Sequence, residues 1–260
     1  MDLGLSGRAA LVTGASKGIG RSIALTLADE GMDVALVARS REQLDELRAQ
    51  IEKKGRRSVA HAADLTDASA AAAAVEGAVS VFGKLDLLVN NAGATRRGDF
   101  LKLTDADWSD SFSLKFFGAV RMARLAWPHL MRTKGAIVNI AGVAGRYGDA
   151  DFGPVGSVNA ALGLLTKVLA DRGVTDGVRV NAINPGTIET ERTEARIARY
   201  MGDHKVSREQ AIKAILADQR VARFGRPEEI ASLVAMMASG RVDYLHGAVV
   251  DMDGGQMRGV

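Results

Sequence analysis

The sequence contains no cysteine, and its 260 residues carry a formal net charge of only +3. Without cysteine the chain forms neither a disulfide bond nor a zinc site built on thiolates. The small positive charge is spread along the chain with no dense block of lysine and arginine. This argues against nucleic-acid binding, because a protein that tracks phosphates needs a basic stripe. The four histidines are scattered without ligand spacing, so no metal site is predicted.

Long apolar segments are also missing. No run of residues approaches the ~20 apolar positions that a helix needs to cross a bilayer, so no membrane interaction is predicted. The first residues, MDLGLSGRAALVTG, lack the basic and apolar regions of a signal peptide. We therefore expect a cytoplasmic protein. Its length and its 47% hydrophobic composition suit one large α/β domain.

Short apolar runs alternate with amphipathic helices along most of the chain. The runs predict strands within 8–14, 33–40, 58–65, 85–93, 136–142, 178–186 and 248–255, and helices within 21–31, 41–55, 67–83, 105–135 and 152–170. Strands that are apolar throughout are typical of a parallel sheet covered on both faces. The prediction is a single Rossmann-type domain spanning 1–260, a doubly wound sheet in three α/β/α layers, with a helical lid around 187–226.

The glycine-rich segment TGASKGIG, residues 13–20, lies between the first predicted strand and the first helix. Gly14 permits a tight turn, Gly18 lets the backbone approach a pyrophosphate, and Gly20 allows close helix packing. The helix N-terminus supplies free N–H groups and partial positive charge for phosphates. The segment predicts a dinucleotide site that also includes Ser16, Lys17 and Ile19.

The end of the second strand bears on the choice of cofactor. An NAD-binding protein places an acidic residue about 20 residues after the glycines, where it accepts from the ribose 2′-OH. Here the segment reads Ala38-Arg39-Ser40-Arg41, with no carboxylate. Arg39 and Ser40 suit a 2′-phosphate, and Lys17 adds positive charge. The sequence therefore favours NADP(H) over NAD(H); the alternative is a solvated arginine pair at a helix start.

Taken together, these motifs resemble the short-chain dehydrogenase/reductase family over nearly the whole chain. Residues 13–20 match its T-G-x-x-x-G-x-G, 90–93 its N-N-A-G, and 253–255 its C-terminal signature. Further matches are the Asp64-Leu65 pair and the 184–186 segment with Thr190. The resemblance implies that the cofactor is also contacted by Asp64, Leu65, Asn91, Ala92, Gly93, Asn159, Pro185, Gly186 and Ile188.

The same resemblance implies a catalytic set of Asn, Ser, Tyr and Lys. The segment AALGLLTKVLA, which follows the family's lysine, fixes the register of the fifth helix. This alignment puts Asn159 at the Lys position, Val155 at the Tyr position and Gly142 at the Ser position. Lys115, three residues before Gly118, falls at the Asn position. The chain is thus interpreted as a divergent member that lacks the usual catalytic set.

Valine and glycine carry no proton to donate, whereas a positioned acid contributes ~10²–10⁴ in rate. Lys115 and Tyr147 are the main candidates for a substitute proton donor, and Asp149, Asp151 and Ser157 are weaker ones. Lys115 can donate a proton if a low dielectric lowers its pKa. The alternative is that its side chain reaches solvent or pairs with a carboxylate. Tyr147, on the loop that enters the site, can also donate a proton. The alternative is that its side chain only packs against its neighbours. Asn159 still suits a hydrogen bond to ribose hydroxyls.

Three functions follow from this pattern. The first is an NADP(H)-dependent oxidoreductase with a non-standard active site acting on an unknown small-molecule substrate. The second is a catalytically inactive nucleotide-binding sensor or scaffold, and the third is a non-redox elimination or dehydration on the same scaffold. The preference for an enzyme rests on the family resemblance. The resemblance also implies a homotetramer.

Overall fold

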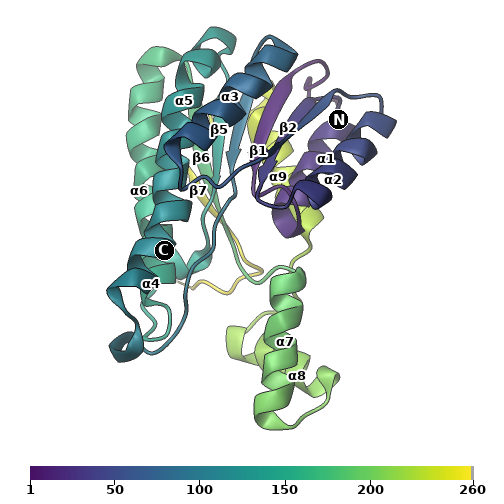
Figure 1. The fold of residues 1–260 in the computed structure, drawn as a ribbon. Coiled ribbons are helices and arrows are strands. Elements are labelled where there is room, and N and C mark those ends of the chain that lie inside the picture. The colour runs from purple at the N-terminus through teal and green to yellow at the C-terminus, as the bar shows by residue number, and fades with distance from the viewer. Residues whose placement is uncertain (259–260) are drawn as a thin grey trace.

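The apolar runs of the sequence form seven strands of one parallel sheet in the computed structural model, which describes residues 1–258 (Figure 1). The strands are β1 (Ala9–Thr13), β2 (Asp33–Ala38), β3 (Ser58–Ala62), β4 (Leu87–Asn90), β5 (Ala136–Ile140), β6 (Arg179–Pro185) and β7 (Val249–Met252). They lie in the order β3-β2-β1-β4-β5-β6-β7. The strand order reverses between β1 and β4, and ligands of such sheets bind at this point beyond the carboxyl ends of the strands.

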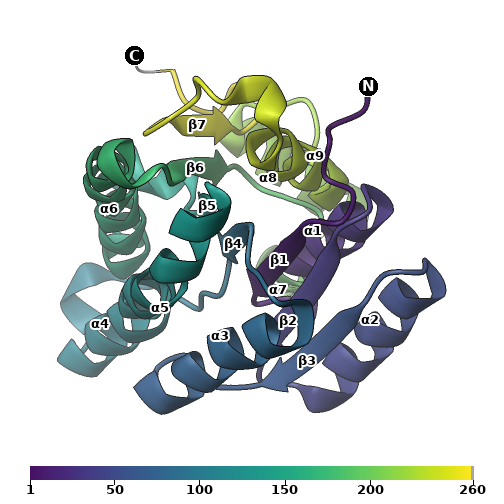
Figure 2. The same ribbon diagram turned by 90° about the horizontal axis from the view of Figure 1, so that it is seen from above.

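Helices cover both faces of the sheet, as Figure 2 shows from above. One face carries α1 (Gly18–Asp29), α2 (Arg41–Lys53) and α9 (Pro227–Ala238), and the other carries α3 (Ala68–Phe82), α5 (Gly118–Thr133) and α6 (Gly153–Asp176). Side chains alternate along each strand. Ala10 and Val12 therefore pack into the core under α1, while Ala9 and Leu11 pack into the core under α3 and α5. The predicted doubly wound α/β fold is confirmed.

The helix predicted over 105–135 is not one regular α-helix. It consists of α4 (Asp105–Phe112), a π-helical segment η2 (Ser113–Phe117) and α5. A π-helical turn inserts an extra residue into the hydrogen-bond ladder and often lies at a functional site. Lys115 is at the centre of this turn. The spacing of apolar residues did not reveal the change.

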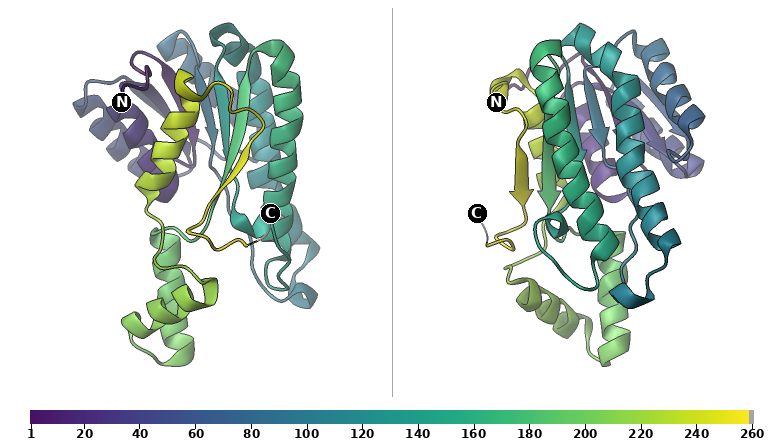
Figure 3. Two further views of the ribbon diagram at one scale, coloured as in Figure 1. Left: turned by 180° about the vertical axis from the view of Figure 1, so that it is seen from behind. Right: turned by 90° about the vertical axis from the view of Figure 1, so that its left-hand side faces the viewer.

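The predicted lid region contains α7 (Glu191–His204) and α8 (Arg208–Gln219), which project beyond the carboxyl edge of the sheet (Figures 1 and 3). The two helices share a small core of their own, formed by Ile197, Ala211, Ile215 and Phe224. Short 3₁₀ turns lie at Phe100–Lys102 (η1), Val143–Gly145 (η3) and Gly240–Val242 (η4). Among residues 1–258, no helix is long and apolar enough to cross a membrane.

Candidate active site

The glycine-rich turn between β1 and α1 is packed against the loop after β4. Gly14 and Gly18 have φ of 65° and 55°, a region that side chains disfavour. A Cβ on Gly14 would lie 2.9 Å from Cα of Ala92, and one on Gly20 would overlap the carbonyl oxygen of Gly14. The first N–H groups of α1 point toward this turn, as at any helix N-terminus, and the side chain of the preceding Lys17 forms no hydrogen bond with them. This geometry is that of a phosphate cradle.

Thr13 joins this turn to β4 by hydrogen bonds. Its hydroxyl donates to the carbonyl of Val89 (3.1 Å) and accepts from the backbone N–H groups of Asn91 (2.9 Å) and Ala92 (3.0 Å). The Asn91 amide in turn donates to the carbonyls of Thr13 (3.0 Å) and Gly14 (3.1 Å). Asn91, predicted to contact the cofactor, therefore uses its side chain to hold the turn. Sequence reasoning missed Thr13, although it is the first residue of the glycine motif.

The residues predicted to select the cofactor lie together at the ends of β2 and β3. Arg39 is exposed, and no carboxylate oxygen of residues 1–258 lies within 4.0 Å of it. Ser40 precedes α2, but its side chain forms no capping hydrogen bond. Asp64 accepts from the backbone and the hydroxyl of Thr66 (2.9 and 2.8 Å), and these bonds lower its pKa; the nearby charge of Arg39 acts in the same direction. Both Arg39 and Ser40 keep donors available.

The remaining predicted cofactor residues line the same edge of the sheet. Leu65 and Ile188 are buried in the two main cores. Gly186 follows β6, and a Cβ there would lie 2.9 Å from Cα of Asp253. Thr190 lies beside the glycine turn, since its Cγ2 would be 3.2 Å from a Cβ on Gly18. The glycine motif that begins at Thr13 and the C-terminal motif that begins at Asp253, 240 positions later, thus lie at the same edge of the sheet.

Lys115 lies under the loop after β4, with its amino group between β5 and α6. Its Nζ donates to the carbonyl oxygen of Ala141 (2.8 Å) and to Oδ1 of Asn159 (2.6 Å). Its aliphatic chain passes Gly93, where a Cβ would lie 2.9 Å from Cδ of Lys115. Desolvation, and secondly the positive charge of Arg192, lower the pKa of Lys115 from 10.5 to about 7.

Gly142 and Val155 complete the surroundings of this pair. A Cβ on Gly142 would lie 2.9 Å from Nδ2 of Asn159, so the glycine leaves room for the asparagine amide. Val155 is buried at the start of α6, with 7% of its surface exposed. Asn159 thus contacts both the Lys115 ammonium and the backbone at Gly142, although the three residues come from different segments. Val155 supplies only apolar surface.

Tyr147, the other candidate proton donor, is half-buried on the loop between η3 and α6. Desolvation, with the charge of Asp149, raises its pKa, while the opposing effects of Arg97 and Arg196 are smaller. Its hydroxyl forms no hydrogen bond within the described part of the chain. A phenol with a raised pKa is a weaker acid than usual, so Tyr147 is the less suitable of the two candidates.

A chain of buried amides that the sequence did not suggest lies below this site. Asn90 donates to Oδ1 of Asn139 (2.9 Å), and Asn139 donates to the hydroxyl of Thr166 (2.9 Å). Asn184 similarly accepts from the N–H of Gly142 (3.2 Å) and donates to Asp251 (2.8 Å). Buried polar groups of this kind need partners, and together they tie β4, β5, β6, β7 and α6 into one framework.

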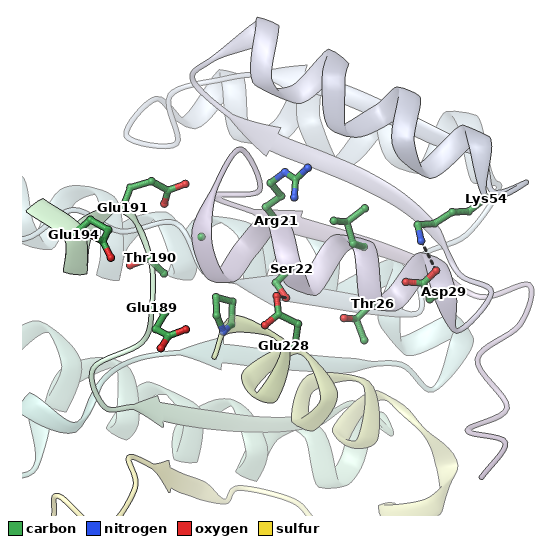
Figure 4. A pocket seen from close by; sticks show the side chains of 13 residues that line it. Arg21, Ser22, Thr26, Asp29, Lys54, Glu189, Thr190, Glu191, Glu194 and Glu228 are labelled. Atoms are coloured by element: carbon green, nitrogen blue, oxygen red, sulfur yellow. Dashed lines mark hydrogen bonds and ion pairs between the residues drawn. The ribbon is translucent and has the colours of Figure 1, made fainter. Parts of the chain in front are cut away.

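A separate groove of about 750 Å³ lies on the outer side of α1, between α1 and α9 (Figure 4). Its lining includes the carboxylates of Glu189, Glu191, Glu194 and Glu228. Ser22 donates to Glu228 (3.4 Å), and Lys54 pairs with Asp29 at the far end. This concentration of negative charge is unsuited to phosphates. The groove borders the glycine turn, since Gly18 and Thr190 belong to its lining, but its acidic part extends away from the turn along α1.

The glycine cradle and the neighbouring polar side chains define a class of protein, and comparison with known sequences agrees. Residues 8–200 match the family described as short chain dehydrogenase. The chain belongs to this family.

Particular relatives extend the match over nearly the whole chain. The 3-oxoacyl-[acyl-carrier-protein] reductase FabG of Staphylococcus aureus is 37% identical over 250 residues, covering 95% of this chain and 97% of the relative. The corresponding reductase of Thermotoga maritima is 32% identical over 252 residues, covering 96% and 98%. L-sorbose reductase of Gluconobacter frateurii, solved with NADPH and L-sorbose, superposes with a TM-score of 0.95 at 32% identity, covering all of both chains. The chain is thus similar to oxidoreductases throughout its length.

Proposed function

We propose that this protein is an NADP(H)-dependent oxidoreductase with a non-standard active site, in which Lys115 takes over the role of proton donor. In the alignment with the family, Lys115, Gly142, Val155 and Asn159 stand where the catalytic Asn, Ser, Tyr and Lys are expected. No phenol is therefore available at the usual position. The proposal rests on the cofactor cradle, on Lys115, and on the family to which the chain belongs.

The residues present fit NADP(H). The glycine turn leaves no space for side chains at Gly14 and Gly20, as close approach to a pyrophosphate requires. Arg39 is free of carboxylate partners within residues 1–258, and the Ser40 side chain is not used as a helix cap. Both suit the additional phosphate of NADP(H). The relative L-sorbose reductase was solved with NADPH. Bound NADPH would supply a hydride.

The position and acidity of Lys115 are the observation that carries the proposal. Its ammonium group has three N–H donors. Ala141 and Asn159 accept two of them, which leaves one for a substrate oxygen. With a pKa of about 7, the group is a far better acid at neutral pH than an ordinary lysine. As hydride addition builds negative charge on that oxygen, Lys115 stabilises the charge and then transfers a proton to it.

The other residues act by positioning Lys115. Asn159 holds the ammonium through Oδ1, and its Nδ2 remains available for a ribose hydroxyl. Gly93 and Gly142 provide the space that this arrangement needs on two sides. Val155, one turn before Asn159 on α6, adds buried apolar surface on that side of the helix.

The test is NADPH oxidation by the purified protein with a panel of carbonyl compounds, enones and imines. The panel includes L-sorbose and a 3-oxoacyl thioester, because the names of two relatives specify these substrates. We expect turnover of at least one member. Lys115→Ala should lower kcat/KM by ~10²–10⁴, with NADPH affinity retained. Lys167→Ala, an exposed lysine on α6, serves as the matched control.

Two results would contradict the proposal. Full activity of Lys115→Ala would exclude Lys115 as the donor. Tight NADPH binding without turnover of any panel member would instead favour the inactive sensor or scaffold.

We also propose that the protein is a homotetramer. Leu164 and Val168 lie one turn apart on α6 and are 67% and 58% exposed, which supports an apolar contact between copies. Light scattering should give four times the mass of the chain, and a monomeric mass would refute this.

A further inference from the structure

Three arginines lie around the mouth of the proposed active site. Arg97 is on the loop after β4, and Arg192 and Arg196 are one turn apart on α7, on the same face of that helix. Arg192 donates from Nη2 to the carbonyl oxygen of Gly93 (3.2 Å). This contact brings the face of α7 against the loop that covers Lys115.

The guanidinium of Arg97 is held in place by the aromatic ring of Phe152. Its central carbon is 4.3 Å from the centroid of the Phe152 ring, a cation–π contact. The backbone N–H of Gly98 donates to the carbonyl of Asp151 (3.0 Å), which joins the two loops. A guanidinium resting on a ring keeps the donors along its edge available for a planar anion.

Within the described residues, two members of this arginine set (Arg97, Arg192 and Arg196) form no ion pair, and the third forms only a long one. Among residues 1–258, no carboxylate oxygen lies within 4.0 Å of Arg97 or Arg192, and Arg196 is 4.0 Å from the exposed Asp218. Other arginines nearby are paired: Arg208 forms an ion pair of 2.8 Å with Glu194, and Arg223 forms one of 2.6 Å with Glu229.

The mutual repulsion of the set is evident in the pKa of Arg97. Desolvation lowers it first, and the charges of Arg196 and Arg192 lower it further. Asp149 opposes these effects but contributes less than either arginine. Like charges that are kept close together with few counter-ions are expected where an anion binds.

We propose that the arginine set binds an anionic group of the substrate, a carboxylate or a phosphate, and so selects oxo compounds that carry such a group. This inference rests on the proposed function, because it places the reducible carbon beside Lys115. The anion lies toward α7 and the oxygen to be protonated lies toward Asn159. The second positive centre then orients the substrate before reduction.

The experiment compares binding of matched anionic and neutral oxo compounds. The pairs are pyruvate with methyl pyruvate, acetoacetate with methyl acetoacetate, and dihydroxyacetone phosphate with dihydroxyacetone. Calorimetry on protein loaded with NADP⁺ measures binding without reduction. We expect the anion of at least one pair to bind about 10- to 100-fold more tightly, as hydrogen bonds to charged groups allow. The pair that responds distinguishes a carboxylate from a phosphate.

Variants connect the preference to the arginine set. Arg97→Ala and Arg196→Ala should each reduce it, and Arg97→Lys should retain part of it because the charge remains. Arg132→Ala, an exposed arginine at the far end of α5, should leave it unchanged. The preference should also weaken as salt is added.

The proposal is overturned if no pair favours the anion, or if the preference survives in the Arg97→Ala/Arg196→Ala double variant. A prior NADPH titration separates this failure from that of the proposed function. Protein that binds NADPH but shows no anion preference refutes only the arginine set, whereas protein that does not bind NADPH refutes the cofactor assignment.

Discussion

The two halves of the carboxyl edge are built in different ways. On the side of β1 and α1, the site consists mainly of backbone, and Gly14 and Gly20 have atoms of the chain where a Cβ would be. On the side of α5 and α6, the site consists of side chains, and Lys115 and Asn159 meet across 44 positions of sequence. The first half carries the glycine motif of the family, and in the proposed function the second half carries Lys115 in place of the usual proton donor.

The difference follows from packing. A backbone cradle tolerates almost no change, because any added atom overlaps the neighbouring loop. A site made from side chains can be rearranged when several residues change together. Here Gly142 leaves space for the Asn159 amide, and Asn159 accepts from the Lys115 ammonium. The residues of the second half are therefore expected to depend on one another.

Asn159→Lys should produce the largest loss of stability. It places a second ammonium within hydrogen-bond range of Lys115 in a desolvated site. We expect the free energy of unfolding below pH 7 to fall by ~3–5 kcal/mol, the range for an uncompensated buried charge. Adding Lys115→Asn removes the repulsion, so the double variant should regain most of the loss. Urea unfolding of the four proteins measures the coupling. Equal stability of the single and double variants would contradict the idea of mutual dependence.

Thr13→Ala tests the backbone-built half. The substitution leaves the partly buried N–H groups of Asn91 and Ala92 without their acceptor. We expect the free energy of unfolding to fall by ~2–3 kcal/mol, since each unsatisfied group costs ~1–3 kcal/mol. Thr13→Ser keeps the hydroxyl and should recover most of this. If the serine variant is as unstable as the alanine variant, the hydroxyl does not hold the turn.

Arg39→Ala should have a smaller effect, limited to the choice of cofactor. NADPH affinity should fall ~10- to 100-fold through loss of charged hydrogen bonds, while NADH affinity stays the same. Arg41→Ala is the control, because Arg41 already pairs with Asp45 at 2.7 Å. Fluorescence titration with both cofactors gives the ratio. An unchanged ratio in Arg39→Ala would remove the basis for NADP(H).

The fold and the cradle could be predicted because their signals are local. Apolar runs such as 34–38 are buried at every position, and the glycine pattern of 13–20 lies directly between a strand and a helix. The proposed departure from the family's catalytic set at positions 115, 142, 155 and 159 was also inferred from the sequence, by alignment. The contacts that those residues make could not be predicted, because the π-helical turn at Lys115 and the hydrogen bonds of its amino group depend on packing between distant elements.

The arginine set was invisible for the same reason. Arg97 and Arg192 are separated by 95 positions, and nothing in the local sequence distinguishes them from solvated arginines. Only the positions of α7 and the loop after β4 bring them together. Charges that converge through tertiary structure leave no spacing pattern to find.

The pH dependence of kcat/KM for reduction tests the role of Lys115 most directly, because it reports the pKa of the essential acid in the free enzyme. The protonated form is the donor, so kcat/KM should be constant below about pH 7 and fall about tenfold per unit above it, with the midpoint near the lowered pKa of Lys115. Lys115→Arg, which keeps a charge but does not release its proton, should be slow and lack this step. A wild-type profile that stays flat to about pH 9, or a step that persists in Lys115→Arg, would contradict the account.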